Sequence, residues 1–422
     1  MRALRRSLPP ALHQRDFTLL WLSLMASGSA AQMAQVAVGW QVYSIHRSAF
    51  DLGLVGLAEF LPVPLLTLPA GQTADRFPRA RVFAASLAVQ AAVVGGLLVV
   101  TIVDAHSLWP FLVLAAATGA AGAFGAPAAR SMPPELVAVE ILPSAMALRS
   151  IAFQVAAVGG PALGGLLFAI DPEAAYAAAV GLTVLAVVWM LALRHPNSVS
   201  REIATSTGVQ SLLLGIRFVR ATPIILGAIS LDLFAVLFGG AVALLPLYAR
   251  SILHTGPLGL GILRSGPAIG ALAAGILLAR KPIKGRAGRT LLIAVGTFGA
   301  AIVVFGLSRW FLVSLVALAV SGYVDMYSMN IRSTTVALAA PNLLRGRVTA
   351  VENVFIGASN ELGSFESGAA AALLGATPAV VAGGVVTIVL ALVWGRLFPD
   401  LAHVDRLEDV RPAREYADVA AA

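Results

Sequence analysis

The chain has 422 residues, of which 59% are hydrophobic and only 12% are charged, and its formal charge is +8. Soluble domains carry about 25% charged residues, so too few charges are present to cover the surfaces of soluble domains. The same composition excludes a disordered chain, which needs low hydrophobicity and high charge. The basic residues lie in short segments between apolar runs and not on one soluble face, which argues against a nucleic-acid partner. A polytopic membrane protein remains.

Twelve apolar runs are long enough to cross a bilayer, which requires about 20 residues in a helix. They cover 17–44, 51–70, 82–103, 108–130, 145–170, 174–193, 223–249, 257–279, 290–307, 310–331, 347–374 and 378–398. We expect α-helices because a lipid-exposed backbone must satisfy its own hydrogen bonds, and the alternating pattern of barrel strands is absent. The expected fold class is therefore an all-α membrane protein with twelve transmembrane helices in two pseudo-symmetric six-helix bundles.

The basic residues also predict the orientation of the chain. With the N-terminus in the cytoplasm, 24 of the 29 basic residues fall in cytoplasmic segments and only three fall in outer loops. The positive-inside rule therefore places both termini in the cytoplasm. Arg in place of Lys and the abundance of Ala indicate a high-GC bacterium, so we expect a multi-pass protein of the bacterial cytoplasmic (inner) membrane.

A polar segment divides the sequence into two halves. We expect an N-terminal bundle at 1–194, a cytoplasmic linker at 195–222, a C-terminal bundle at 223–398 and a cytoplasmic tail at 399–422. The halves resemble each other at a shift of about 202–206 residues. In one example, Gly56, Glu59 and Pro62 match Gly261, Arg264 and Pro267. A repeated six-span unit in parallel orientation predicts a binding site between the halves, near mid-membrane.

The segment between spans 2 and 3 carries a signature, Gly-x-x-x-Asp-Arg/Lys-x-Gly-Arg/Lys-Arg/Lys. Four residues fit it: Gly71, Asp75, Arg76 and Arg79. Pro78 and Ala80 depart from it. The segment resembles the signature of the major facilitator superfamily, and the resemblance implies a cytoplasmic gate. In that gate Asp75 caps the start of span 11 and pairs with a nearby Arg, and Arg130 lies at the cytoplasmic end of span 4. A solvated loop charge is the alternative for Asp75.

Span 5 carries a second motif, in which small residues surround a proline. Its residues are Gly159, Gly160, Pro161, Gly164 and Gly165. The motif resembles one found in antiporters of the same superfamily, with Ala156 in place of the first glycine, and it implies export. Glycines let helix backbones touch, and Pro161 bends the helix and frees a carbonyl group.

The second half resembles the enterobactin-exporter-like branch of this superfamily and related drug effluxers. The resemblance rests on residues 243–249, 259–264 and 345–363. It implies export of a siderophore or amphipathic drug by proton antiport and alternating access, with the proton gradient as the energy source and no cofactor. The expected partners are a small organic substrate, protons and the lipid bilayer, and we expect a monomer. Span 4 lacks the mid-membrane Arg that is common in proton-coupled drug antiporters, which weakens a proton mechanism copied from them.

Ionisable residues inside spans are costly and therefore mark functional sites. Asp232, about ten residues into span 7, is the first candidate for coupling to protons or to a cationic substrate. Asp325, deep in span 10, is the second candidate. Three polar residues lie near it in the sequence: Tyr323, Tyr327 and Asn330. Structural, hydrogen-bonded aspartates are the alternative, and Arg332, seven residues on, could simply neutralise Asp325.

Further polar residues lie in spans 1, 2 and 11. Glu59 in span 2 is a third coupling candidate, and an ion pair with its repeat partner Arg264 is the alternative. Gln32 and Gln35 form a stripe on span 1 that suits either a cavity wall or helix packing. The expected substrate cavity comprises Gln32, Gln35, Asp232, Tyr323, Tyr327 and Asn330. In span 11 the expected contacts between the halves are made by Glu352, Asn360, Glu361 and Glu366.

Enzyme motifs are missing from the sequence. It has no nucleotide-binding loop, no His-Glu-x-x-His motif, no Gly-x-Ser-x-Gly elbow and no cysteine, so we expect no metal site and a transporter rather than an enzyme. Two alternatives stay open. One is a facilitator or importer of the same fold without proton coupling, and the other is a membrane enzyme or scaffold that transports nothing.

Overall fold

Long apolar runs form helices throughout the part of the chain that the structure describes. The computed structural model describes residues 9–194 and 209–410, and every regular element in these two stretches is helical. Ten of the helices are long and apolar enough to cross a membrane. Two more predicted spans correspond to α2 (Arg15–His46) and α16 (Asn342–Leu374), which carry polar residues along their length. The prediction of an all-α membrane protein is confirmed.

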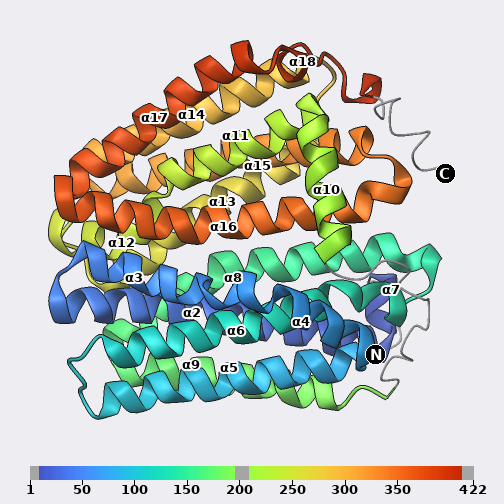
Figure 1. Ribbon diagram of the computed structural model, residues 1–422. Helices are drawn as coiled ribbons and strands as arrows, with labels where there is room; N and C mark the ends of the chain where they lie inside the picture. The colour runs from blue at the N-terminus through green and yellow to red at the C-terminus, as the bar shows by residue number, and fades with distance from the viewer. Residues whose placement is uncertain (1–8, 195–208, 411–422) are drawn as a thin grey trace. The chain divides into compact units, whose positions relative to one another are not determined.

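Two compact units are formed by the chain. Unit 1 comprises Met1–Arg47, Ala58–Ala204 and Thr255–Ser265. Its long helices are α2, α4 (Pro62–Arg76), α5 (Arg79–Ile102), α6 (Trp109–Ser131), α8 (Leu142–Ile170) and α9 (Pro172–Leu191). Within this unit α2 packs against α8 and α9, and α5 packs against α6 and α9, so these helices run side by side (Figure 1). The short α7 (Pro133–Leu136) follows α6.

Unit 2 comprises Ser48–Leu57, Thr205–His254 and Gly266–Ala422. Its main helices are α10 (Val209–Ala221), α11 (Pro223–Gly239), α14 (Ala287–Leu307), α15 (Phe311–Ala339), α16, α17 (Ala376–Leu397) and the short α18 (Pro399–Ala402). Here α14 packs against α15 and α17, and α11 packs against α16 and α17. Part of the predicted linker is helical, since α10 lies in it, whereas 195–208 lie outside the described residues.

Two helices contribute residues to both units. The first part of α3 (Ala49–Phe60) belongs to unit 2, and the first part of α13 (Pro257–Arg280) belongs to unit 1. In unit 2 a Cβ atom at Gly53 would lie 3.2 Å from the Cα atom of Gly368, and in unit 1 a Cβ atom at Gly165 would lie 3.0 Å from the Cα atom of Gly261. Each of these two segments is therefore held in its unit by direct backbone packing.

The two units are defined by contacts between residues. The predicted boundaries of the two bundles, at 194 and 223, stay a prediction.

Two predicted spans are broken by proline or glycine. Span 2 is not one helix, because the helix is interrupted at Leu61 between α3 and α4, directly before Pro62, which has no backbone N–H to donate. Span 7 is not continuous to residue 249. The helix α11 ends at Gly239, and a 3-10 turn, the short α12 (Leu245–Leu247) and a π turn carry the chain on to Ile252. Glycine favours such an ending because it pays a large entropy cost inside a helix.

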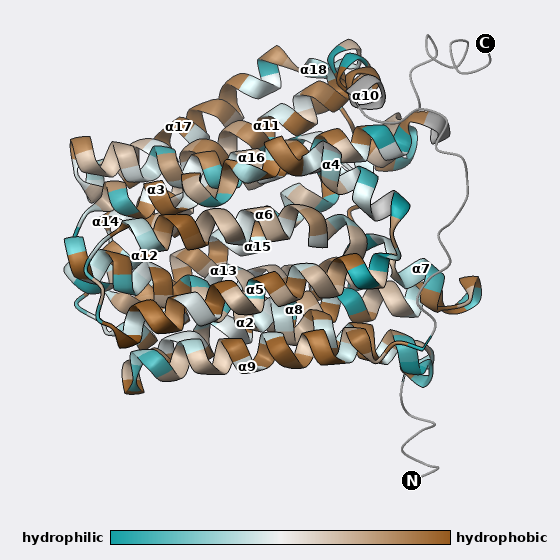
Figure 2. Cartoon of the chain, turned by 60° about the horizontal axis from the view of Figure 1, so that its bottom comes forward, coloured by the Kyte–Doolittle hydropathy of each residue, from teal (hydrophilic) through white to brown (hydrophobic). Residues whose placement is uncertain are grey.

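Hydrophobic side chains cover the long helices along most of their length. Figure 2 shows hydrophobic residues along the helices and hydrophilic residues gathered near many helix ends and in the connecting loops. Many large apolar side chains are exposed in both units, among them Leu65 (76%), Trp109 (74%) and Leu392 (65%). Exposed apolar surface of this extent is typical of a protein whose helices contact membrane lipid.

Close helix packing in unit 2 depends on paired glycines. At the crossing of α14 and α17, a Cβ atom at Gly299 would lie 2.6 Å from the carbonyl oxygen of Gly384, and one at Gly384 would lie 2.8 Å from the oxygen of Gly299. The two backbones therefore touch where neither residue has a side chain. In a membrane, where lipid tails are as apolar as the helices, such van der Waals packing is a main source of helix association.

This crossing predicts a large effect of a single side chain. Gly384→Leu is expected to lower stability by at least about 1–3 kcal/mol, the usual cost of overpacking, because the new side chain meets backbone atoms of α14. Gly181→Leu in α9 is the matched control, since no atom lies within 4 Å of a Cβ atom there. Thermal unfolding of both purified variants in detergent tests the crossing, and equal melting temperatures would contradict it.

Candidate functional site

A buried ion pair joins α11 to α15. The guanidinium group of Arg332 donates a hydrogen bond from Nη1 to Oδ1 of Asp232. Arg332 is 4% exposed and Asp232 is 7% exposed. Asp232 is nine residues beyond Pro223, the start of α11, which places it about 13 Å along the helix. The pair therefore lies well inside the apolar region, where ionised groups are tolerated only when paired.

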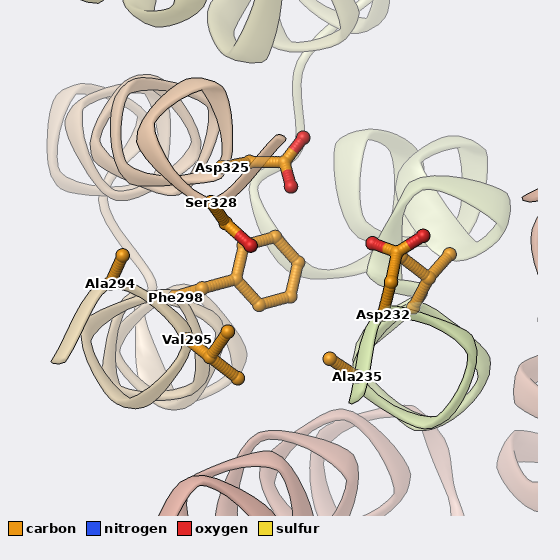
Figure 3. A pocket seen from close by; sticks show the side chains of 8 residues that line it. Asp232, Ala235, Ala294, Val295, Phe298, Asp325 and Ser328 are labelled. Carbon is orange, nitrogen blue, oxygen red and sulfur yellow. The ribbon is translucent and has the colours of Figure 1, made fainter. Parts of the chain in front are cut away.

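Asp325 shares a small cavity with Asp232. Both carboxylates point into the same space in Figure 3, with the ring of Phe298 and the hydroxyl group of Ser328 beside them. Four further side chains line the cavity: Ala235, Val236, Ala294 and Val295. Within the described residues, Asp325 makes no hydrogen bond or ion pair of its own, although the charges of Asp232 and Arg332 act on it. The cavity thus holds two carboxylates in apolar surroundings.

A third carboxylate belongs to the same electrostatic environment. Glu352 on α16 interacts electrostatically with both Arg332 and Asp232. We call Asp232, Asp325, Arg332 and Glu352 the charge cluster. It contains three carboxylates and one guanidinium group, so its acidic groups outnumber its basic group. The Nε atom of Arg332 is buried without a hydrogen-bond partner in the described part of the chain, which leaves this donor for another acceptor.

Arg332 has an ion-pair partner that the sequence did not indicate. Its spacing from Asp325 left neutralisation of that residue open as an alternative; its ion pair is with Asp232 on another helix, and its charge also acts on Asp325. Seven residues on one helix do put Asp325 and Arg332 on one face. Periodicity along α15 says nothing about the neighbour across the helix interface, which here is α11.

The other residues expected in a substrate cavity lie elsewhere. Tyr323 and Tyr327 are neighbours on α15, with tilted rings whose centroids are 5.4 Å apart and with hydroxyl oxygens 3.4 Å apart. Neither they nor Asn330 line the cavity that holds Asp232 and Asp325. A single cavity made of all the predicted residues stays a prediction.

A second polar group lies in unit 1. The Nη2 atom of Arg264, on the first part of α13, donates to Oε1 of Gln35 on α2 at 2.7 Å. The charge of Arg264 also acts on Glu59 of α3. The structure therefore brings together Glu59 and its repeat partner Arg264, with Gln35 beside them. Gln32 lies about one turn before Gln35 on α2. It packs against α8, since a Cβ atom at Gly160 would lie 2.7 Å from the Cβ atom of Gln32.

The signature segment after α4 is only partly described. Arg79 forms an ion pair with Glu135 of α7 and donates to the carbonyl oxygen of Ser131 at 3.4 Å. Arg76 and Arg130 are exposed, and Gly71 is partly buried. The side chain of Asp75 lies outside the described residues. Glu135 was missed because it is 56 positions from Arg79, and no local pattern marks it.

The glycines of the span 5 motif have distinct neighbours. A Cβ atom at Gly164 would lie 2.7 Å from the Cα atom of Met33 on α2, so α8 and α2 touch at this level. Gly165 faces Gly261 of α13, whereas Gly159 has open space around it. Pro161 is fully inside α8. The motif residues at 160, 164 and 165 therefore serve close helix approach.

Polar residues of α16 are spread along the whole helix. Asn360 donates from Nδ2 to the carbonyl oxygen of Ile356 at 2.9 Å. A carboxylate oxygen of Glu361 would lie 3.7 Å from a Cβ atom at Gly56, which places this residue beside the first part of α3 in unit 2. Glu366 is partly buried near the same end of α16. The predicted role of these residues in contacts between the halves stays a prediction.

The charge cluster predicts an unequal response to loss of each partner. Arg332→Gln removes the one cation of the charge cluster and should cost about 3–5 kcal/mol, as breaking a buried pair usually does. Asp232→Asn should cost less, because Asp325 and Glu352 still balance the guanidinium group. Melting temperatures of the purified variants measure the order. If Asp232→Asn proved the more damaging change, the shared-cation arrangement would be wrong.

Comparison with known proteins places the chain in a family. A family model described as "transmembrane secretion effector" matches residues 7–416. The multidrug efflux pump Tap of Mycolicibacterium fortuitum is 28% identical over 363 residues, which cover 83% of this chain and 88% of that protein. The enterobactin exporter EntS of Shigella dysenteriae is 27% identical over 342 residues, covering 79% of this chain and 78% of that protein.

Solved structures of transporters share the fold. A bacterial homologue of the human lysosomal transporter spinster superposes with a TM-score of 0.71 and 15% identity, covering 92% of this chain and 98% of that one. A POT family transporter gives a TM-score of 0.73 at 11% identity and covers 94% and 99% of the two chains. Together, the family model, the relatives and the helical fold show that the chain belongs to the transmembrane secretion effector family of the major facilitator superfamily, whose members are transporters and not enzymes.

Proposed function

We propose that the protein is a secondary active exporter that exchanges protons for a small organic molecule by alternating access. The observation that carries this proposal is Asp325, a carboxylate without an ion pair of its own beside the buried pair of Asp232 and Arg332. Of the two carboxylates that line the cavity, Arg332 balances Asp232, and a second negative charge in these apolar surroundings is neutralised most simply by a proton. Asp325 is therefore the proposed proton carrier, and Asp232 is the fixed partner of Arg332.

Proton movement through Asp325 requires that the residue exchange its proton on both sides of the membrane. When Asp325 is ionised, Arg332 can serve both carboxylates through its several donors, including the unpaired Nε atom. When Asp325 is protonated, the cluster loses one negative charge and the attraction of its carboxylates for Arg332 weakens. This change in charge gives the two protonation states different interactions around α11 and α15, and a difference in interaction energy is what any coupled conformational change needs. The proton gradient supplies the energy, without a cofactor.

The proposed substrate class is a siderophore or an amphipathic drug. The names of the relatives, a multidrug efflux pump and an enterobactin exporter, support this class. The antiporter-like motif of α8 supports the direction of transport. We further propose a monomer in the bacterial cytoplasmic membrane with both termini in the cytoplasm. The orientation rests on the basic residues: without the buried Arg332, 23 lie in the segments predicted to be cytoplasmic and three lie in outer loops.

A facilitator or importer without proton coupling is the second candidate. One observation favours it: α6, which corresponds to span 4, carries its Arg only at the helix end, as Arg130. A proton relay of the kind found with a mid-membrane Arg therefore has no counterpart on this helix. The two candidates differ in whether substrate movement releases protons.

Substrate-driven proton release should depend on Asp325. We expect a compound from a panel of catecholate siderophores, lipophilic cations and neutral drugs to release protons from acidified inside-out vesicles that contain a pH dye. Asp325→Asn should abolish the signal, whereas Asp400→Asn, outside the spans, should leave it unchanged. Transport of a compound at the wild-type rate by Asp325→Asn, without any proton signal in either protein, would favour the facilitator.

Single cysteines can test the orientation, because the chain has none of its own. Lys281→Cys, in an exposed loop after α13, should react with an impermeant maleimide only in inside-out vesicles. His106→Cys, in the exposed loop between α5 and α6, should react only in intact cells. The reverse pattern would place both termini outside.

A further inference from the structure

A groove in unit 1 has apolar walls and one charged residue. It is lined by Thr73, Phe77, Arg81, Val82, Ala85, Ser86, Val89, Ala120, Ala121 and Phe124, and its volume is about 450 Å³. Most of its walls come from α5 and α6, which pack against each other, and Thr73 is the one lining residue from α4. Phe77, in the turn between α4 and α5, also lines the groove.

The polarity of the groove is concentrated at the end near this turn. The two hydroxyl groups in its walls are already used: Thr73 donates to the carbonyl oxygen of Pro69 at 2.7 Å, and Ser86 donates to that of Ala121 at 2.7 Å. Arg81 is exposed and is the one charged residue among the lining side chains. A ligand that fits these walls has one anionic end and an apolar remainder.

The dimensions suit one leaflet of a bilayer. Arg81 begins the groove on α5 and Val89 is eight residues further on, which corresponds to about 12 Å along the helix. Half of the hydrocarbon core of a bilayer is about 15 Å thick. Phe77 (57% exposed) and Val89 (48% exposed) leave large apolar surfaces open near the two ends. An acyl chain can therefore lie along the groove while its headgroup stays at the membrane surface.

We infer that this groove is a binding site for an anionic phospholipid, whose acyl chain lies against Ala85 and Val89 and whose phosphate group pairs with Arg81. Charge selects the lipid: the segment 76–81 has three arginines, and the ion pair of Arg79 with Glu135 leaves Arg76 and Arg81 exposed. Basic residues near a membrane surface attract anionic headgroups. The site is separate from the charge cluster and does not depend on the proposed transport mechanism.

A second groove of similar size provides an internal control. It lies in unit 2 between α14 and α15, has a volume of about 500 Å³, and is lined by Thr297, Ala300, Ala301, Val304, Leu312, Val313, Val316, Ala317 and Val320. None of these nine residues is charged, and Thr297 donates its hydroxyl group to the carbonyl oxygen of Ile293 at 2.8 Å. This groove should accept acyl chains without regard to headgroup charge.

The test compares photo-crosslinking of two lipids in mixed micelles. Phosphatidylglycerol and phosphatidylcholine with the same diazirine-bearing acyl chain are crosslinked to the purified protein, and labelled residues are mapped by mass spectrometry. We expect phosphatidylglycerol to label the first groove about fivefold more than phosphatidylcholine, the effect of about one basic residue. The second groove should be labelled equally by both lipids.

Variants distinguish the contribution of the lipid headgroup to binding from that of the acyl chain. Arg81→Gln should reduce the preference to near one, and Arg81→Lys should keep it. Ala85→Phe should lower labelling of the first groove by both lipids, while its counterpart Ala300→Phe should affect only the second groove. Labelling of the unaltered groove reports that each variant is folded. An equal ratio of the two lipids in the wild-type first groove, or a preference that survives Arg81→Gln, would overturn the proposal.

Discussion

The buried guanidinium group of Arg332 is the one positive charge that balances the carboxylates of the charge cluster. It lies inside the apolar region with Asp232 as its ion-pair partner, and its charge also acts on Asp325 and Glu352. An unpaired charge in such surroundings costs several kcal/mol, so the position of this group is tightly constrained. Every change in the protonation of a neighbouring carboxylate must alter the interactions of Arg332. In the proposed mechanism this dependence is what couples a proton to the movement of helices.

Close packing at glycine residues positions the helices that carry these charges. On α11, a Cβ atom at Gly239 would lie 2.6 Å from the ring of Phe298, so α11 and α14 approach closely where Phe298 forms a wall of the cavity. On α15, Gly322 packs directly against the backbone at Pro267 of α13. Helices this close cannot be pushed apart slightly to relieve a buried charge. The cavity is therefore small, and the balance of charge inside it has to be met by pairing or by protons.

The sequence predicted much of the fold and the identity of the acidic residues, for a clear physical reason. Crossing lipid requires long apolar helices, and a carboxylate such as Asp232 or Asp325 stands out against that background. Partners across helix interfaces could not be predicted in the same way. The pairing of Arg332 with Asp232 and that of Arg79 with Glu135 join residues 100 and 56 positions apart, and helical periodicity gives only the face on which each residue lies. The interruption at Leu61 was missed because hydropathy is continuous there while the hydrogen-bond ladder is not.

Infrared difference spectroscopy of the reconstituted protein tests the central claim most directly. The account predicts a carbonyl band of a protonated carboxylic acid that disappears when the pH is raised and that is absent in Asp325→Asn. A band that keeps its intensity in Asp325→Asn would show that the proton resides on another carboxylate, and would contradict the account.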